Sequence, residues 1–185
     1  MYKKLVAALA LTVAGSAVSA ATIDFVGFGA GTYGSQIVID GHTITNTSGG
    51  QILVGAGAAG EIDGFCSLTP NVYSCEADTD ITFASVVSNL SFDLDGSNPG
   101  DMVTISIYGI ANALLGSLIF TTPDQHIDLS AYGQITRLFF DDNSSGAGYG
   151  YSTFQFDTAQ VPLPAGGVLL LTALLGLGAA KRRKS

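Results

Sequence analysis

The chain has 185 residues, enough for one folded domain with short flanking segments. Arg137 is the only lysine or arginine between Lys4 and Lys181, whereas all fifteen acidic residues, from Asp24 to Asp157, lie in that middle region. One positive charge against fifteen negative charges gives the middle region a formal net charge of −14. This balance argues against nucleic-acid binding, which needs lysine and arginine for the phosphates, and against adsorption to anionic lipid.

The first 20 residues are predicted to form a secretory signal peptide. Lys3 and Lys4 supply a short positive region, and the apolar run over 5–14 is too short for a comfortable membrane span. Val18 and Ala20 are small residues at the two positions that signal peptidase inspects. The sequence therefore predicts export, with cleavage by signal peptidase after Ala20.

Residues 21–160 are predicted to form one β-sandwich. Apolar and polar residues often alternate there, and helical periodicity is nearly absent. The clearest hairpin joins 36–39 to 42–45 through Asp40-Gly41, a pair that tolerates the positive φ angles of a two-residue turn. Leu114 begins either a strand or a short helix. Further strands are expected over 22–28, 51–54, 80–86, 90–94, 102–108, 114–121, 135–140 and 151–157. About ten short strands between turns predict an all-β, antiparallel, jelly-roll-like sandwich.

Cys66 and Cys75 enclose eight residues, which include the turn-forming pair Pro70-Asn71. In an exported protein, a disulfide that closes this short loop is the expected state. A zinc site is disfavoured because two cysteines nine positions apart, without a nearby histidine, do not complete a ligand set. A redox pair is disfavoured because there is no Cys-x-x-Cys motif.

The segment 141–151 holds the candidate ligand-binding residues. Asp141 and Asp142 belong to the densest group of hard oxygen ligands in the chain. Solvated turn residues are the favoured interpretation, and a structural calcium ion held by these two carboxylates is the alternative. Tyr149 and Tyr151 are the candidate aromatic contacts for a sugar, since the chain has no tryptophan. No other cofactor is expected.

No catalytic motif stands out. The chain lacks a Gly-x-Ser-x-Gly elbow, and His42 and His126 are expected at surface or strand-edge positions. The run from Gly55 to Gly60 fits a dinucleotide-binding pattern, but no helix is predicted after it, so a loop is expected. Fifteen acids guarantee many carboxylate pairs, and a pair alone therefore says nothing about glycoside hydrolysis. We predict that the protein is not an enzyme.

Residues 161–185 are predicted to form an anchor or sorting segment. The run 165–180 carries no charge and would span roughly 24 Å as a helix, slightly short of a hydrocarbon core of about 30 Å. A basic cluster follows at once and is expected to stay in the cytoplasm, which gives a weak stop-transfer helix with the body outside. The cluster consists of Lys181, Arg182, Arg183 and Lys184.

The order of these C-terminal parts resembles the PEP-CTERM class of sorting signals, in its VPLPA-CTERM variant. The matching residues are Val161, Pro162, Leu163, Pro164 and Ala165, with the apolar run and the basic end behind them. The resemblance implies removal of the tail by an exosortase-type membrane protease, and association with exopolysaccharide. The second half of the body is also similar to bodies attached to such tails, which are suspected of resembling carbohydrate-binding sandwiches. The alternative is an ordinary single-pass anchor.

These features together predict an exported, non-enzymatic protein with a signal peptide over 1–20, a body over 21–160 and a sorting segment over 161–185. The precursor is expected in the inner membrane, and the processed protein at the cell surface or in the extracellular matrix. Its expected partners are signal peptidase, the exosortase-type protease and exopolysaccharide. The alternatives are a calcium-dependent carbohydrate-binding module and a secreted glycan hydrolase.

Overall fold

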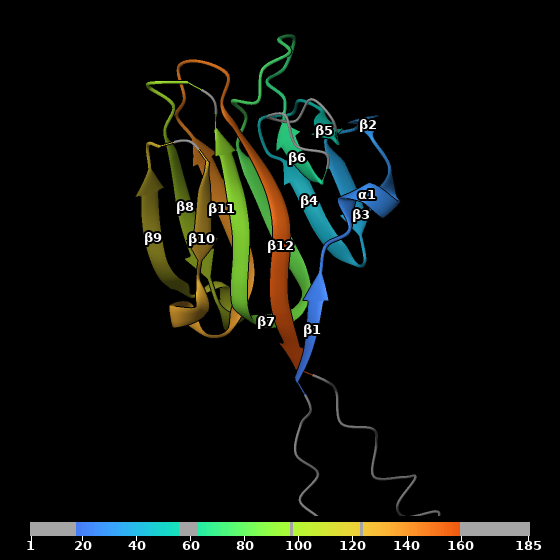
Figure 1. Cartoon of the computed structure of the whole chain (residues 1–185), viewed down its shortest axis with the longest axis vertical. Coiled ribbons are helices and arrows are strands. Elements are labelled where there is room, and N and C mark those ends of the chain that lie inside the picture. Colours follow the sequence, from blue (N-terminus) through green and yellow to red (C-terminus); the bar gives the residue numbers. More distant parts are fainter. Residues whose placement is uncertain (1–17, 56–62, 97, 123, 160–185) are drawn as a thin grey trace, which may run out of the picture. The chain divides into compact units, whose positions relative to one another are not determined.

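The computed structural model describes residues 18–55, 63–96, 98–122 and 124–159, which form one all-β unit (Figure 1). The predicted sorting segment, most of the predicted signal peptide and the glycine-rich run after Gly55 lie outside these residues. Within the described ranges, no helix has the length and apolar character needed to cross a membrane.

The described residues contain twelve strands, one turn of α-helix and two 3-10 helices. Every pair of named strands is antiparallel, as the sequence predicts. The elements are β1 (Val18–Thr22), α1 (Phe25–Phe28), β2 (Gly31–Tyr33), β3 (Gln36–Ile39), β4 (His42–Asn46), β5 (Ile52–Val54), β6 (Gly64–Ser67), β7 (Thr79–Gly96), β8 (Val103–Tyr108), η1 (Ile110–Asn112), β9 (Leu114–Phe120), β10 (Gln125–Asp128), η2 (Ser130–Tyr132), β11 (Ile135–Asp142) and β12 (Tyr149–Ala159).

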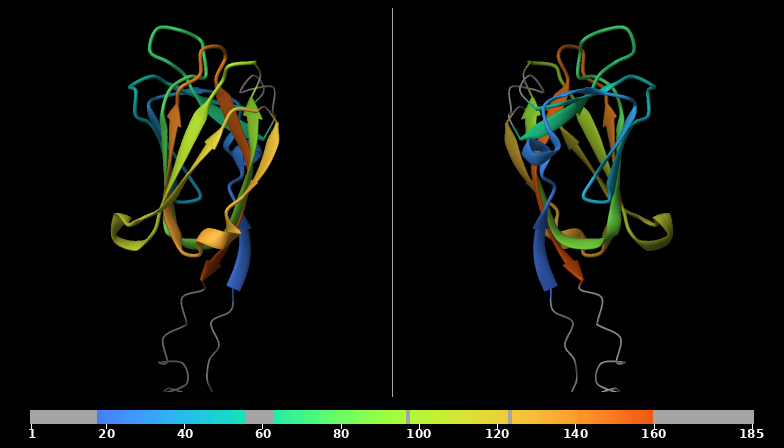
Figure 2. Two further views of the ribbon diagram at one scale, coloured as in Figure 1. Left: turned by 90° about the vertical axis from the view of Figure 1, so that its left-hand side faces the viewer. Right: turned by 90° about the vertical axis from the view of Figure 1, so that its right-hand side faces the viewer.

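The long strand β7 belongs to both layers of the sandwich, which Figure 2 shows edge-on. Its first half pairs with β4 and β11, and β3, β8 and β9 extend that layer. Its second half pairs with β10 and β12, and β6, β5, β2 and β1 extend the other layer. Between the halves, Asn89 has a φ of 49° and donates from Nδ2 to Asp157 Oδ2 at 2.7 Å. This left-handed residue marks the bend that carries the strand from one layer to the other.

The core lies between the two layers and follows the predicted alternation. Two sets of alternating residues are fully buried: Leu90, Phe92 and Leu94 in β7, and Val103, Ile105 and Ile107 in β8. Aromatic rings fill the centre, where Phe92 and Phe154 stack with their centroids 5.0 Å apart. Phe25 and Phe65 pack against the same Phe154 ring. Because one face of each layer supplies these side chains, the predicted β-sandwich architecture is confirmed.

The predicted hairpin is also confirmed. Strand β3 pairs with β4 in the expected register, and Asp40 and Gly41 have φ angles of 51° and 83°. The 80–86 and 90–94 segments belong to a single strand, β7, rather than two. The alternative helix at Leu114 is wrong, since this residue begins β9 after the short 3-10 turn η1.

The expected strand over 22–28 is wrong beyond Thr22. Phe25–Phe28 forms a helical turn instead, because Asp24 accepts the Gly27 N–H at Oδ1 (2.7 Å) and so caps its start. Phe25 remains buried, so the turn still delivers its apolar side chain to the core. A local side-chain bond to the backbone competes here with the ladder that alternation predicts.

Candidate functional site

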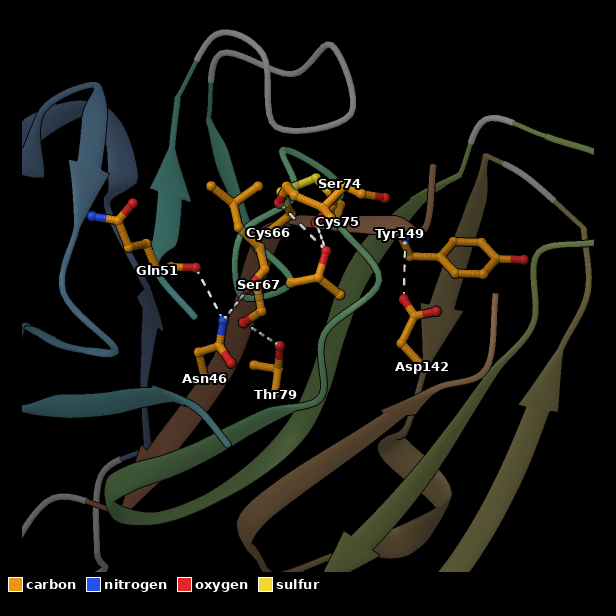
Figure 3. Close-up of a disulfide and its surroundings, with 12 residues drawn as sticks. Asn46, Gln51, Cys66, Ser67, Ser74, Cys75, Thr79, Asp142 and Tyr149 are labelled. Atoms are coloured by element: carbon orange, nitrogen blue, oxygen red, sulfur yellow. Dashed lines mark hydrogen bonds between the residues drawn. A yellow bond between two sulfur atoms is a disulfide. The ribbon is translucent and has the colours of Figure 1, made fainter. Parts of the chain in front are cut away.

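A disulfide joins Cys66 to Cys75, with the two Cα atoms 5.4 Å apart, and confirms the predicted pairing (Figure 3). Cys66 lies in β6 and is fully buried. Cys75 forms a bridge with Gly148 and donates its N–H to the Ala147 carbonyl at 3.0 Å. The loop that the disulfide closes is therefore fixed to the segment that leads into β12.

Hydrogen bonds within this loop hold its projecting part. The Thr69 N–H donates to the Ser74 carbonyl at 2.9 Å, and Asn71 sits at the turn with a φ of 67°. Val72 and Tyr73 follow the turn and point into solvent, with 60% and 74% of their surface exposed. A clamped loop thus presents an aromatic ring and an aliphatic side chain that contribute little to the core.

A groove of about 420 Å³ lies beside the loop, and we call it the disulfide-loop groove. Buried Asn46 connects its two walls, since its Nδ2 donates to the carbonyls of Gln51 (3.0 Å) and Leu68 (2.8 Å). Any side chain at Gly50 would collide with the Leu68 carbonyl oxygen, so the close approach of the walls requires glycine there. The lining consists of Gly49, Gly50, Gln51, Leu68, Thr69, Pro70, Asn71, Val72 and Tyr73.

All nine lining residues are uncharged. The groove combines an exposed ring, Tyr73, with amide and hydroxyl groups from Gln51, Asn71 and Thr69. Aromatic faces pack on apolar ring surfaces, while amides and hydroxyls exchange hydrogen bonds with polar substituents. This chemistry suits an uncharged polyhydroxylated ring better than it suits an ion. The predicted sugar contacts were Tyr149 and Tyr151 rather than Tyr73, although the turn pair before Tyr73 within a disulfide loop was a signal for exposure.

A second, polar groove of about 210 Å³ lies over β7, β10 and β12. Its residues include serine, histidine and aspartate, the types found in a hydrolase triad. The contacts differ from a triad, however: His126 Nδ1 lies 2.6 Å from Asp93 Oδ1, whereas Ser152 Oγ donates to Asp95 Oδ2 at 2.8 Å. Ser152 is also buried. The serine is therefore paired with a carboxylate and not with the base that would activate it. His126 is exposed and on a strand edge, as predicted, while His42 is buried between β-strand aromatics.

Asp142 closes the loop before β12. Its Oδ1 accepts the Ser144 N–H at 2.9 Å, and its Oδ2 accepts the Tyr149 N–H at 3.3 Å. Burial raises the pKa of its carboxyl to about 6. Among the residues that the structure describes, no group of three or more histidine, cysteine, aspartate or glutamate side chains could hold a metal ion. Calcium can also take carbonyl, amide and water oxygens, so the calcium site at Asp141 and Asp142 stays a prediction.

Tyr149 and Tyr151 do not lie on a contact surface, which corrects the predicted role in sugar binding. Each is only 1% exposed, and the Tyr151 ring centroid lies 4.3 Å from that of Phe140. The reason is a register shift in β12 at Thr153, whose φ is 54°. This bulge lets odd-numbered residues before it and the even-numbered Phe154 after it face the same core.

We expect Asp142 to make the unfolding free energy depend on pH. Its pKa is higher in the folded protein than in an unfolded chain, so the folded state binds more protons between about pH 4 and pH 6. Stability should therefore fall as pH rises through this window, by about 1–2 kcal/mol for a partly hydrated carboxyl. Urea unfolding at pH 4.5 and 7.5 should show this fall in the wild type and a smaller one in Asp142→Asn.

Asp128→Asn is the control for that measurement. Hydrogen bonds from Ser130 lower the pKa of Asp128, which is the opposite direction, so its removal should leave the fall between the two pH values in place. Equal pH dependence in the wild type and in Asp142→Asn would contradict the assignment.

Tyr151→Phe is expected to leave stability unchanged or to raise it by about 1 kcal/mol. The Tyr151 hydroxyl is buried and has no hydrogen-bond partner among the residues that the structure describes, and an unpaired buried hydroxyl costs free energy. Tyr149→Phe is the matched control, because the Tyr149 hydroxyl donates to the Asp101 carbonyl at 3.2 Å and its removal should destabilise. Thermal unfolding of both variants would test this, and a loss at Tyr151 as large as that at Tyr149 would refute it.

Among the comparisons with known proteins, only the comparison with solved structures found matches. No family model matches the chain, and no curated protein matches it. A family two carbohydrate esterase from Cellvibrio japonicus aligns with a TM-score of 0.35 and 13% identity over 80% of this chain and 36% of that one, so the chain spans about a third of the esterase. A variant of a family 29 carbohydrate-binding module aligns with a TM-score of 0.36 and 11% identity over 80% of this chain and 99% of the module. Another variant, complexed with mannohexaose, aligns with a TM-score of 0.35 and 12% identity over 77% and 94%. Similarity at this level carries no information on a ligand or a reaction.

Proposed function

We propose that the chain is an exported, non-enzymatic protein of the cell surface or extracellular matrix, sorted through residues 161–185. In this proposal the two flanking apolar segments act as the signal peptide and the exosortase-type sorting helix. The β-sandwich body is held at the end where β1 meets β12, and it displays the disulfide-loop groove at the other end.

The main structural support for this proposal is the course of β12. The strand begins at Tyr149, directly after the bridge between Gly148 and Cys75, and it ends at Ala159. At about 3.3 Å per residue, the strand separates Tyr149 from Ala159 by about 33 Å. It runs from the end of the body near β6 to the end where it pairs with β1 (Figure 1). The disulfide-loop groove and Ala159 therefore lie at opposite ends of the body.

The N-terminal end of the body supports the same arrangement. Strand β1 pairs Val18 with Ala159 and Ala21 with Phe156, so both ends of the body emerge together. Cleavage after Ala20 would remove three residues of β1 and leave Ala21 and Thr22 in the pairing. A disulfide and a strongly acidic surface also fit a protein that works outside the cytoplasm.

The intact mass of the protein recovered from its native cells tests this proposal. A soluble or surface-released form that lacks residues 1–20 and the segment from about Val161 onward is expected. A single membrane-bound form that retains Lys181 to Ser185 would reject sorting in favour of a permanent anchor. Deletion of the exosortase-type protease should convert the first result into the second.

A second candidate function is the binding of a neutral glycan in the disulfide-loop groove. The observation that favours it is an uncharged groove with the exposed ring of Tyr73 on an otherwise acidic body. Negative charge around the groove would repel acidic polysaccharides, so neutral ones are the expected ligands. Affinity electrophoresis in a panel of neutral polysaccharides should show retardation that Tyr73→Ala removes and that Ile110→Ala, another exposed apolar position, preserves.

The same gels distinguish the calcium-dependent version of this function. Retardation that survives EDTA would indicate binding by the groove alone. Retardation that EDTA abolishes would require a calcium site, and millimolar calcium should then raise the melting temperature. Equal mobility in every polysaccharide would remove the candidate.

A further inference from the structure

Strand β9 forms one edge of the sandwich. It pairs with β8 from Val103↔Phe120 to Tyr108↔Leu114, and no other described strand pairs with it (Figure 1). The free side of such a strand carries a row of N–H and C=O groups that can form a ladder with another chain. Seven residues give an edge long enough for several pairs.

The side chains of this edge are unusually apolar for exposed positions. Leu114, Leu115 and Ile119 are exposed, with 66% of the Ile119 surface accessible, and Ile110 is exposed in the preceding turn. The sequence has no charged residue from Gly109 to Pro123, although the body has a formal net charge of −14. The edge is thus an uncharged strip on a molecule that otherwise repels its own copies.

The other edge strands differ from β9. Strand β10 carries His126 and Asp128 and follows Asp124, and inserted charges of this kind protect an edge from pairing. Strand β3 exposes Val38, at 55% of its surface, but it is only four residues long and ends beside Asp40. Strands β1 and β2 are uncharged edges too, but they have only five and three residues, whereas β9 has seven and exposes Leu114, Leu115 and Ile119.

We propose that β9 pairs antiparallel with β9 of a second copy, so that two bodies share one continuous layer. A strand that pairs with itself about a twofold axis needs only its own sequence to be complementary. With Ser117 on the axis, Leu115 of each copy lies opposite Ile119 of the other, which forms two apolar cross-strand pairs on the outer face. On the inner face, Gly116 lies opposite Leu118, and the Tyr132 ring of the same copy packs against this glycine.

When two copies of the body meet, electrostatic repulsion favours contact through β9 over contact through any charged surface. Two bodies of the same strong negative charge repel one another, and the repulsion is weakest where neither presents a charge. That condition is met when the strips over 109–122 face each other. The inference concerns the body alone and does not depend on the proposed sorting or on the groove.

Sedimentation velocity of the full chain in a mild, uncharged detergent tests the proposal. We compare the wild type with Ile119→Lys, which places a charge on β9, and with Val38→Lys, which places the same charge at a similarly exposed position on β3. The wild type and Val38→Lys should dimerise at tens of micromolar protein. Ile119→Lys should have a dissociation constant at least tenfold higher.

Two results would overturn the inference. A wild type that stays monomeric at about 100 µM, a concentration on the order of the dissociation constants of weak protein contacts, would exclude the pairing whatever the variants do. Equal dimerisation of all three proteins would place the contact elsewhere, for example in the C-terminal segment that all three share. Circular dichroism and the melting temperature of Ile119→Lys must match the wild type, and Ile119→Thr, which keeps a β-branched side chain without the charge, should fall between the two.

Discussion

Phe154→Ala is expected to lower the unfolding free energy by about 3–5 kcal/mol. The ring is fully buried and contacts three aromatic rings, Phe25, Phe65 and Phe92, from three separate elements. Truncation removes those contacts and leaves a cavity that the two layers of the sandwich cannot close, because the hydrogen-bonded strands fix their spacing. Domains are typically stable by about 5–15 kcal/mol, so the variant should unfold at a much lower urea concentration.

Tyr73→Ala is the control for this change. It removes an aromatic side chain of similar size, but one that is largely exposed, and the urea midpoint should stay close to that of the wild type. Comparable losses at both positions would mean that the core is not centred on the Phe154 ring.

Cys66→Ala/Cys75→Ala is expected to lower the unfolding free energy by about 2–3 kcal/mol. Loop-closure entropy for a ring of about ten residues gives a value of that order, since the cross-link restricts the unfolded chain more than the folded one. The loop also loses its attachment to the Gly148 segment, so any binding through Tyr73 should weaken more than the stability change alone requires. Urea unfolding and polysaccharide retardation measure the two effects separately.

Reduction of the wild type gives the matching control. In dithiothreitol the wild type should unfold with the midpoint of the double variant, and dithiothreitol should not change the double variant. A double variant as stable as the oxidised wild type would show that the loop is already held by Asn46 and by the hydrogen bonds between Thr69 and Ser74.

Much of the fold could be predicted because local and tertiary preferences agree. Asp40-Gly41 adopts the turn that its positive φ angles allow, and the alternation in β8 continues without interruption, so a period of two places the right face inward. The disulfide followed from the prediction of export and from the spacing of the two cysteines. In each case a short stretch of sequence contained all the information that determined the structure.

The failures occur where the strand geometry changes. The positive φ of Thr153 inverts which face of β12 points inward, and no alternation rule anticipates a bulge at a threonine. Tyr149 and Tyr151 were predicted as ligand contacts from their place beside Asp141 and Asp142 and from the absence of tryptophan, and they lie in the core instead. The bend at Asn89 likewise merged two expected strands into one that serves both layers. The exposure of Tyr73 depends on which end of the sandwich the disulfide loop reaches. The position of the loop follows from the strand topology, which patterns in a single sequence do not contain.

The path of β12 from the disulfide to Ala159 gives the body a direction of mechanical strength. A pull applied at the loop and resisted at Ala159 acts along β12, so its ladders with β7, β6 and β1 would share the load in shear. A pull between Val18 and Ala159 would act across the β1–β12 ladder, and its pairs would open one after another from the free end. The same hydrogen bonds would therefore resist a pull at the disulfide loop far better than tension between Val18 and Ala159.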